Sequence, residues 1–140
     1  MGAGPFHSQN IESWFTHVPG LKVVYPSSPM DAKGLLIASI DDPNPVLFFE
    51  HKGLYRSIKS DVQEGIYSLD IGKGSVVQNG NDLTLITYGL GVHWALESIK
   101  TISENKTINL AYCGLPHKLA KKELILTLKI GFILASLVIF

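Results

Sequence analysis

One histidine, in a glycine- and proline-rich loop, is the residue of this sequence best placed to do chemistry. His7 follows the run Gly2-Ala3-Gly4-Pro5-Phe6 and precedes Ser8 and Gln9, whose side chains both form hydrogen bonds. An imidazole exchanges a proton near neutral pH, so a histidine held in such a loop can act as a general acid or base. Taken on its own, the residue could equally be an ordinary loop histidine that makes only structural hydrogen bonds.

Composition restricts the partners and the compartment. The 140 residues carry 12 basic and 12 acidic side chains, so the formal net charge is zero and gives no reason to expect a nucleic-acid partner. Cys113 is the single cysteine, which excludes an internal disulfide and favours a reducing compartment. The first residues lack the basic and apolar pattern of a secretory signal. We therefore expect a cytoplasmic protein.

The elements that must position His7 follow an alternating pattern of helix and strand. A short helix is predicted over Asn10 to Val18, with Asn10 as its cap, and a strand over Lys22 to Tyr25. The next helix is predicted to be capped by Ser28 and to end by Pro43. The apolar run from Val46 to Phe49 predicts a strand buried on both faces. This alternation indicates an α/β fold with a parallel sheet.

A polar segment then separates this part from a second unit. Ser57 to Gly74 is polar and aperiodic, which is typical of a linker. Strands are predicted over Ser75 to Val77 and Leu83 to Tyr88, joined as a hairpin by the turn between them. A helix over about Val92 to Glu104 and a strand over Thr107 to Ala111 complete the pattern. The chain thus contains the end of one α/β domain and the start of another.

Several short motifs keep a fixed order along the chain. They are the loop around His7, Pro19-Gly20-Leu21-Lys22-Val23-Val24-Tyr25-Pro26, Asp31-Ala32-Lys33-Gly34-Leu35-Leu36, Asp41-Asp42-Pro43-Asn44-Pro45 and His51-Lys52-Gly53-Leu54-Tyr55-Arg56. Each motif is weak alone, but their joint order over residues 2 to about 110 resembles the beta subunit, or beta-like half, of the thiamine-diphosphate-dependent 2-oxoacid dehydrogenases. This transketolase-like family includes the branched-chain and pyruvate dehydrogenases.

The resemblance implies a domain plan. Residues 1–56 would form the second half of a pyrimidine-binding domain, residues 57–74 a linker, and residues 75–111 the start of a transketolase-like C-terminal domain. The implied cofactor is thiamine diphosphate, shared with parts outside this chain, together with magnesium bound through the partner. The implied partners are an alpha subunit or alpha-like half and a lipoyl-bearing acyltransferase.

The resemblance also implies roles for particular residues. His7 matches the active-site histidine of the family, which would serve acyl transfer to lipoyl sulfur, and no residue of the chain is assigned to direct cofactor binding. Ser39, Asp42 and Asn44 match positions that supply part of a monovalent-cation site for potassium, and oxygen atoms are the ligands that hard cations prefer. The alternative is that Asp42 and Asn44 only end a helix and form a turn before proline.

The end of the sequence departs from the family pattern. Residues 112–140 do not continue the strand as the family pattern requires. One permitted set of codons for residues 112–117, read one base later, encodes a family-like continuation. This predicts that residues 112–140 are an out-of-frame tail. The stretch from Leu124 to Phe140 is largely apolar but short for a membrane helix and carries Lys129, so we expect no membrane partner.

Three functional classes fit this sequence. The first is a fragment of the beta part of a 2-oxoacid dehydrogenase, inactive alone because the cofactor-activating acid and the diphosphate site would lie elsewhere. The second is another transketolase-like enzyme that uses thiamine diphosphate on a different substrate. The third is a non-catalytic remnant that keeps the fold elements.

Overall fold

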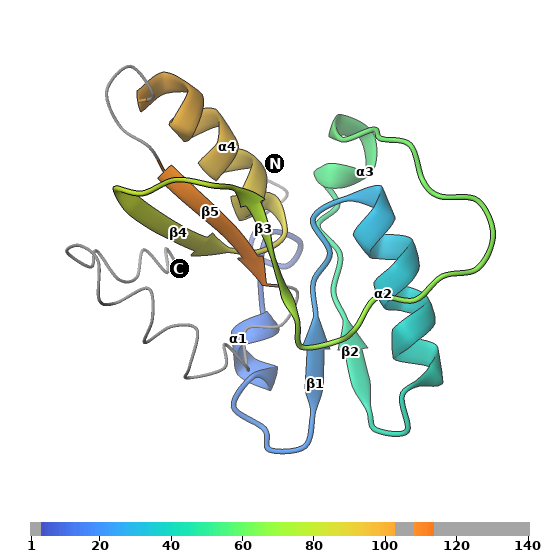
Figure 1. Cartoon of the computed structure of the whole chain (residues 1–140). Helices are drawn as coiled ribbons and strands as arrows, with labels where there is room; N and C mark the ends of the chain where they lie inside the picture. Colours follow the sequence, from blue (N-terminus) through green and yellow to red (C-terminus); the bar gives the residue numbers. More distant parts are fainter. Residues whose placement is uncertain (1–3, 103–107, 114–140) are drawn as a thin grey trace.

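The computed structural model describes residues 4–102 and 108–113 of the chain. Within this part the chain forms a two-stranded parallel sheet and a three-stranded mixed sheet, each flanked by a long helix (Figure 1). In chain order the elements are α1 (Glu12–Phe15), β1 (Lys22–Val24), α2 (Pro29–Asp41), β2 (Val46–Phe48), α3 (Leu54–Ser57), β3 (Gly74–Gln78), β4 (Leu83–Thr87), α4 (Leu90–Ile102) and β5 (Ile108–Cys113). The predicted α/β class is confirmed.

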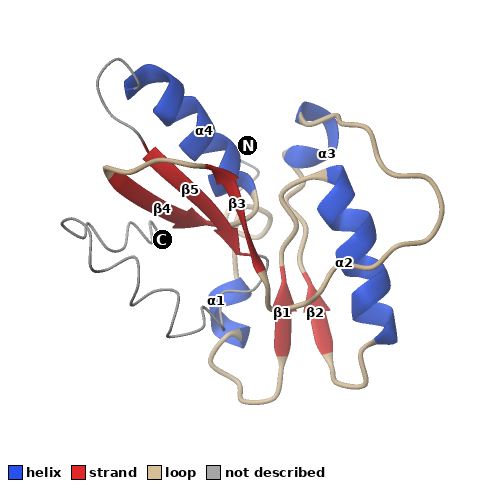
Figure 2. Ribbon diagram, in the orientation of Figure 1, coloured by secondary structure: helices blue, strands red, loops and turns tan. Residues whose placement is uncertain are grey.

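The first sheet and α2 form a βαβ unit (Figure 2). β1 pairs in parallel with β2, from Lys22 opposite Val46 to Val24 opposite Phe48. Parallel neighbours need a crossover connection, and α2 supplies it and packs on β2. Val24 and Leu35 are buried at the centre of this packing.

Local signals set the limits of α2. The Ser28 side chain accepts a hydrogen bond from the backbone N–H of Asp31 at 3.1 Å, and Pro29 occupies the first helical position. The helix ends at Asp41, two residues before Pro43, as predicted. The predicted cap and length of α1 are wrong. The helix covers only Glu12–Phe15, and Ile11 precedes it without a side-chain hydrogen bond, because Asn10 lies one residue too early.

β2 is less covered than its apolar sequence suggests. Its three residues are all half-buried, so the prediction of a strand buried on both faces is wrong for the described part of the chain. α2 packs against the strand, and Phe48 and Val46 lie at the border of the core around Val24 and Leu35. An apolar run therefore marks the strand correctly but does not show how many layers cover it.

The polar segment after α3 lies along α2. The backbone N–H of Leu69 donates to the carbonyl oxygen of Gly34 at 3.1 Å, and the Tyr67 hydroxyl donates to the carbonyl oxygen of Met30 at 2.9 Å. The Lys33 ammonium donates to the carbonyl oxygen of Gln63 at 2.6 Å. The predicted linker is thus irregular in secondary structure but is held to the helix at several points.

The second sheet has the order β3-β5-β4. β3 is antiparallel to β5, and β4 is parallel to it, from Leu83 opposite Ile108 to Thr87 opposite Tyr112. The predicted hairpin between the first two strands is therefore wrong. The chain passes from β4 through α4 before β5 returns between the two strands, so the turn at residues 79–82 connects strands that are not neighbours.

α4 covers the second sheet with an apolar face. Val92 and Ile99 are buried, and Leu83, Leu85 and Leu96 pack around them. Among the described residues no helix has the length and apolar character needed to cross a bilayer. The apolar stretch from Leu124 to Phe140 and most of the predicted out-of-frame tail lie outside the described residues.

Gly34 allows the polar segment to approach α2. A Cβ atom at this position would lie 2.6 Å from Leu69 Cγ. Alanine normally stabilises a helix interior by about 1 kcal/mol over glycine. Here we expect Gly34→Ala to lower the free energy of unfolding by about 1 to 2 kcal/mol, because the added methyl group overpacks the contact. Denaturant titration measures the change.

The control adds Leu69→Ala, which removes one of the two obstructing side chains; the other is Tyr67, whose Cε2 atom would lie 2.8 Å from the new Cβ atom. The double variant should lose less stability than the sum of the two single losses, because the clash with Leu69 exists only when both side chains are present. A Gly34→Ala chain more stable than the wild type would contradict the contact.

β5 extends two residues beyond the predicted Ala111 end. Tyr112 and Cys113 pair with Ser75 and Gly74 of β3. We expect a chain ending at Cys113 to give more soluble protein than the full chain, because it lacks the apolar stretch at residues 124–140. A chain ending at Ala111 should give less than the one ending at Cys113, because it shortens the central strand. Soluble yield at equal expression measures both. Equal yields from the two shortened chains would contradict the second expectation.

Candidate active site

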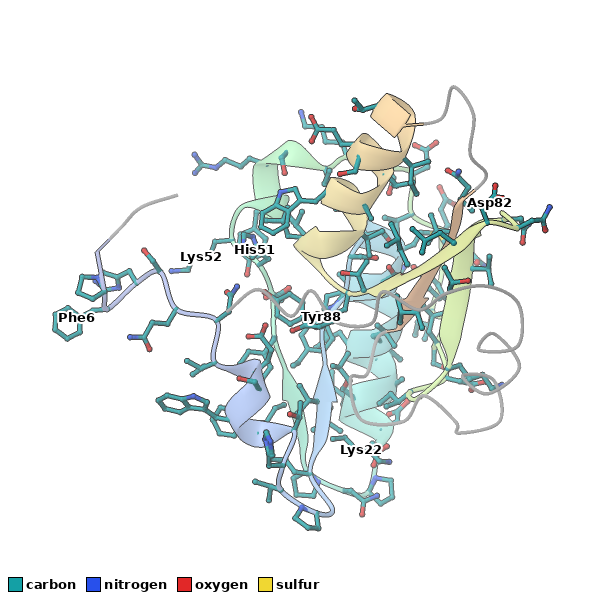
Figure 3. The ribbon with its side chains drawn as sticks, turned by 90° about the vertical axis from the view of Figure 1, so that its left-hand side faces the viewer. Phe6, Lys22, His51, Lys52, Asp82 and Tyr88 are labelled. Atoms are coloured by element: carbon teal, nitrogen blue, oxygen red, sulfur yellow. The ribbon has the colours of Figure 1, made fainter. Side chains whose placement is uncertain are left out.

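His7 lies on an exposed loop at the start of the described chain. Gly4 has φ of 78°, a left-handed conformation suited to glycine, and its carbonyl oxygen accepts the backbone N–H of His7 at 3.3 Å. The Gln9 side chain donates to the carbonyl oxygen of Pro5 at 2.9 Å. Residues 4–10 are all exposed, and Phe6 points away from the rest of the molecule (Figure 3). The loop is thus folded on itself and presents the imidazole to solvent.

The predicted cation residues lie at the C-terminal end of α2. Asp42 forms an ion pair with Lys22, and its Oδ1 atom accepts the backbone N–H and the side-chain N–H of Asn44 at 2.9 and 3.1 Å. One turn earlier, the Ser39 hydroxyl donates to the carbonyl oxygen of Leu35 at 2.6 Å. The structure therefore brings Asp42 and Asn44 together and adds Lys22, which the sequence did not single out.

This arrangement does not resemble a cation site as it stands. Both oxygens of the Asp42 carboxylate already accept donors, and an ammonium group neutralises its charge. The described residues contain no group of three or more histidine, cysteine or acidic side chains arranged to hold a metal ion. The Asp42 carboxylate is thus occupied by Lys22 and Asn44, and the role of Ser39, Asp42 and Asn44 in a cation site stays a prediction.

The carboxyl ends of the parallel strands form a second group of polar residues. This edge of an open α/β sheet is where ligands commonly bind. A cavity of about 120 Å³ lies here, lined by residues after β1 and β2 that include Ser27, Glu50, His51 and Tyr55. The Tyr55 hydroxyl donates to Glu50 Oε2 at 2.8 Å, and His51 Nδ1 accepts the backbone N–H of Gly53 at 3.1 Å. Small-molecule sites usually enclose roughly 300–1,000 Å³, so this cavity alone cannot hold thiamine diphosphate.

A buried polar contact joins the two units beside this edge. Glu12 is only 6% exposed, and its Oε1 atom accepts the Tyr88 hydroxyl at 3.1 Å. The Tyr88 ring lies 5.4 Å from the ring of Tyr25, centroid to centroid. Burial first, and the Glu12 charge second, raise the pKa of Tyr88 to about 12. The same two causes, in the same order, raise the pKa of Tyr25.

The backbone after Tyr88 also contacts the first unit. Gly89 has φ of 53°, and a Cβ atom there would lie 2.7 Å from Tyr25 Cε1, so both the conformation and the contact favour glycine. His93 Nε2 donates to the carbonyl oxygen of Ser27 at 2.7 Å. The second unit is therefore docked on the residues that follow β1.

Sequence reasoning missed this junction. The sequence singled out neither Glu12 nor Tyr88 as a residue of a site. No sequence signal marks their contact, because 76 residues separate them. The rings of His17, His51 and His93 each form a hydrogen bond to the backbone. His117 lies outside the described residues.

The class of domain follows from comparison with known proteins. Residues 2–58 match the family described as the transketolase pyrimidine-binding domain. A solved structure, a split-gene transketolase in the form of an inactive beta4 tetramer, is similar with a TM-score of 0.69 at 17% identity. The similarity covers 86% of this chain and 39% of that one. At this identity the likeness shows the fold, and the predicted transketolase-like architecture is confirmed.

Sequence relatives refine this class. The chain is 52% identical over 100 residues to the 2-oxoisovalerate dehydrogenase subunit beta of Bacillus subtilis, covering 71% of this chain and 31% of that protein. It is 48% identical over 99 residues to the pyruvate dehydrogenase E1 component subunit beta of Staphylococcus epidermidis, covering 71% and 30%. The resemblance to beta subunits of 2-oxoacid dehydrogenases is confirmed. The chain spans less than a third of the length of these curated relatives.

Asp42 should make stability depend on pH in acid. The hydrogen bond from Lys22 first, and those from Asn44 second, lower the pKa of Asp42 from 3.8 to about 2. A depressed carboxyl pKa contributes stability that is present above about pH 4 and is lost as the pH falls through about 2. We expect Lys22→Met to reduce this loss, because the variant lacks the main cause of the low pKa. Melting temperatures of the variant and the wild type between pH 5 and pH 2 measure this loss of stability.

The matched control is Lys52→Met, which removes an exposed lysine from the loop before α3. This variant should keep the acid dependence of the wild type. An identical pH profile for Lys22→Met and wild type would contradict the role of the ion pair.

Proposed function

We propose that this chain is part of the beta side of a thiamine-diphosphate-dependent 2-oxoacid dehydrogenase. Such an enzyme decarboxylates a 2-oxoacid oxidatively and passes the acyl group to a lipoyl group. The observation that carries the proposal is the 52% identity over 100 residues to a 2-oxoisovalerate dehydrogenase subunit beta. The exposed His7 loop supports it, because a group that serves a lipoyl arm on another protein must be reachable from solvent.

In this proposal His7 moves a proton at lipoyl sulfur. When the lipoyl disulfide opens, one sulfur receives the acyl group and the other needs a proton. The imidazolium of His7 donates that proton and is then recharged from solvent, as general acid catalysis by an imidazole requires. Thiamine diphosphate, when bound, supplies the electron sink that decarboxylation requires.

The cofactor and partners come from the rest of the assembly. The cavity of about 120 Å³ at the strand ends is too small for the cofactor, which supports a cofactor site at this edge that is completed by other parts of the assembly. We propose that an alpha subunit or alpha-like half binds the diphosphate and its magnesium, and that a lipoyl-bearing acyltransferase accepts the acyl group. A cytoplasmic location is part of the same proposal.

A second candidate is another thiamine-diphosphate enzyme of the same group. The chain is 50% identical over 98 residues to the acetoin:2,6-dichlorophenolindophenol oxidoreductase subunit beta of Cupriavidus necator, close to its identity with the 2-oxoacid relatives. Acetoin is therefore the substrate that any assay must include beside 2-oxoacids.

A chimaeric subunit tests the proposal directly. The 100-residue matching region of the Bacillus subtilis subunit beta is replaced by the corresponding part of this chain, and the chimaera is assembled with the Bacillus alpha subunit and acyltransferase. We expect lipoyl acylation with 2-oxoisovalerate, pyruvate or both, and a loss of about 100-fold or more with His7→Ala, because a general acid contributes roughly 10²–10⁴-fold. Acyl-lipoyl formation followed by mass spectrometry measures the rate.

The control is His17→Ala, an exposed histidine in the same segment, which should leave the rate unchanged. The 140-residue chain alone should show no turnover. Turnover of acetoin without turnover of any 2-oxoacid would favour the second candidate. An assembled chimaera without any turnover would support a non-catalytic remnant and contradict the proposal.

A further inference from the structure

The first buried side chain after the His7 loop is that of Glu12. Residues 4–10 are exposed, Ile11 is half-buried, and Glu12 is the first buried side chain of the described chain. The hydrogen bonds between Gly4 and His7, and between Pro5 and Gln9, hold the shape of the loop. The contacts of Glu12 then connect the end of this loop to the packed part of the fold.

A side-chain hydrogen bond from the second unit holds Glu12. Its Oε1 atom accepts the Tyr88 hydroxyl at 3.1 Å. Tyr88 follows β4 and is fixed on one side by the Tyr25 ring and on the other by the start of α4, where the backbone N–H of Gly91 donates to its carbonyl oxygen at 3.0 Å. Figure 3 shows Tyr88 at the centre of the molecule and Phe6 at the far end of the N-terminal loop.

The energetics favour a lasting contact. A buried carboxylate without a donor is strongly unfavourable, so Glu12 gains from the Tyr88 hydroxyl. A tyrosine hydroxyl is protonated, and therefore able to donate, across the neutral range, and the raised pKa of Tyr88 extends this range to higher pH. Tyr88 itself has little freedom to move away, since Gly89 lies against Tyr25.

We propose that Glu12 and Tyr88 are a positioning pair that sets the place of the His7 loop from the second unit. The pair is not catalytic, because neither side chain lies on the loop that carries His7. The proposal rests on the proposed function of His7 for its effect on acyl transfer. Its structural part, the attachment of α1 through Tyr88, does not depend on that function.

Hydrogen exchange on the full 140-residue chain tests the attachment. Tyr88→Phe removes the hydroxyl and keeps the ring. We expect backbone amides of residues 11–18 to exchange about tenfold faster, because loss of a hydrogen bond to a buried charge weakens the local structure by about that factor. Amides of residues 90–102 in α4 should keep their rates. Faster exchange in both segments, or in neither, would overturn the proposal.

Variants of Glu12 provide the rescue. Glu12→Gln keeps an acceptor oxygen for Tyr88, so the amides of residues 11–18 should exchange at nearly the wild-type rate. In Glu12→Leu the same amides should exchange as fast as they do in Tyr88→Phe. The double variant Glu12→Leu with Tyr88→Phe should be no faster than either single variant. The matched control is Tyr55→Phe, which removes a hydroxyl bonded to Glu50 and should leave residues 11–18 unchanged.

The effect on chemistry is measured in the chimaeric complex. Tyr88→Phe should lower kcat for lipoyl acylation several-fold and leave the KM for the 2-oxoacid unchanged, because the pair places the proton donor and not the substrate. A wild-type chimaera without turnover contradicts the proposed function but leaves the exchange result valid. An active wild type whose Tyr88→Phe variant keeps the same kcat, or changes KM instead, overturns the positioning role.

Discussion

The two units of this chain are joined where the backbone of Gly89 lies against the ring of Tyr25. Only glycine has no Cβ atom to collide with that ring, and its φ of 53° turns the chain from β4 into α4 at the same point. Tyr88 on one side of this contact bonds Glu12, and His93 on the other bonds the carbonyl oxygen of Ser27. A single close approach therefore fixes the polar contacts between the two units.

Local signals explain how much of the fold could be read from the sequence. Ser28 and Pro29 begin α2, and Pro43 ends it, because caps and prolines act on their nearest neighbours. The hairpin prediction failed for the opposite reason. The turn at residues 79–82 looks like a hairpin turn, but pairing of β3 and β4 is decided by β5, which is far along the chain. Local turn chemistry cannot show that a third strand will lie between two others.

At the candidate site, too, local signals were visible in the sequence and long-range contacts were not. The His7 loop was found because its residue types and the order of the motifs after it are visible in the sequence, and the comparisons confirm that resemblance. Lys22 at Asp42 and Tyr88 at Glu12 were not found, because both contacts join residues brought together only by folding. Reasoning on the sequence therefore singled out His7, whose role is a proposal, but not the contacts that hold the structure around it.

The order of strands in the second sheet has a consequence for how the chain acquires its structure during synthesis. β1 and β2 are both present once residue 48 has been made, so the first sheet can pair early. β3 and β4 do not pair with each other, and each pairs only with β5, whose last residue, Cys113, pairs with Gly74. Until that strand emerges from the ribosome, two strands carry unpaired backbone groups, which makes this interval the time of greatest exposure to aggregation.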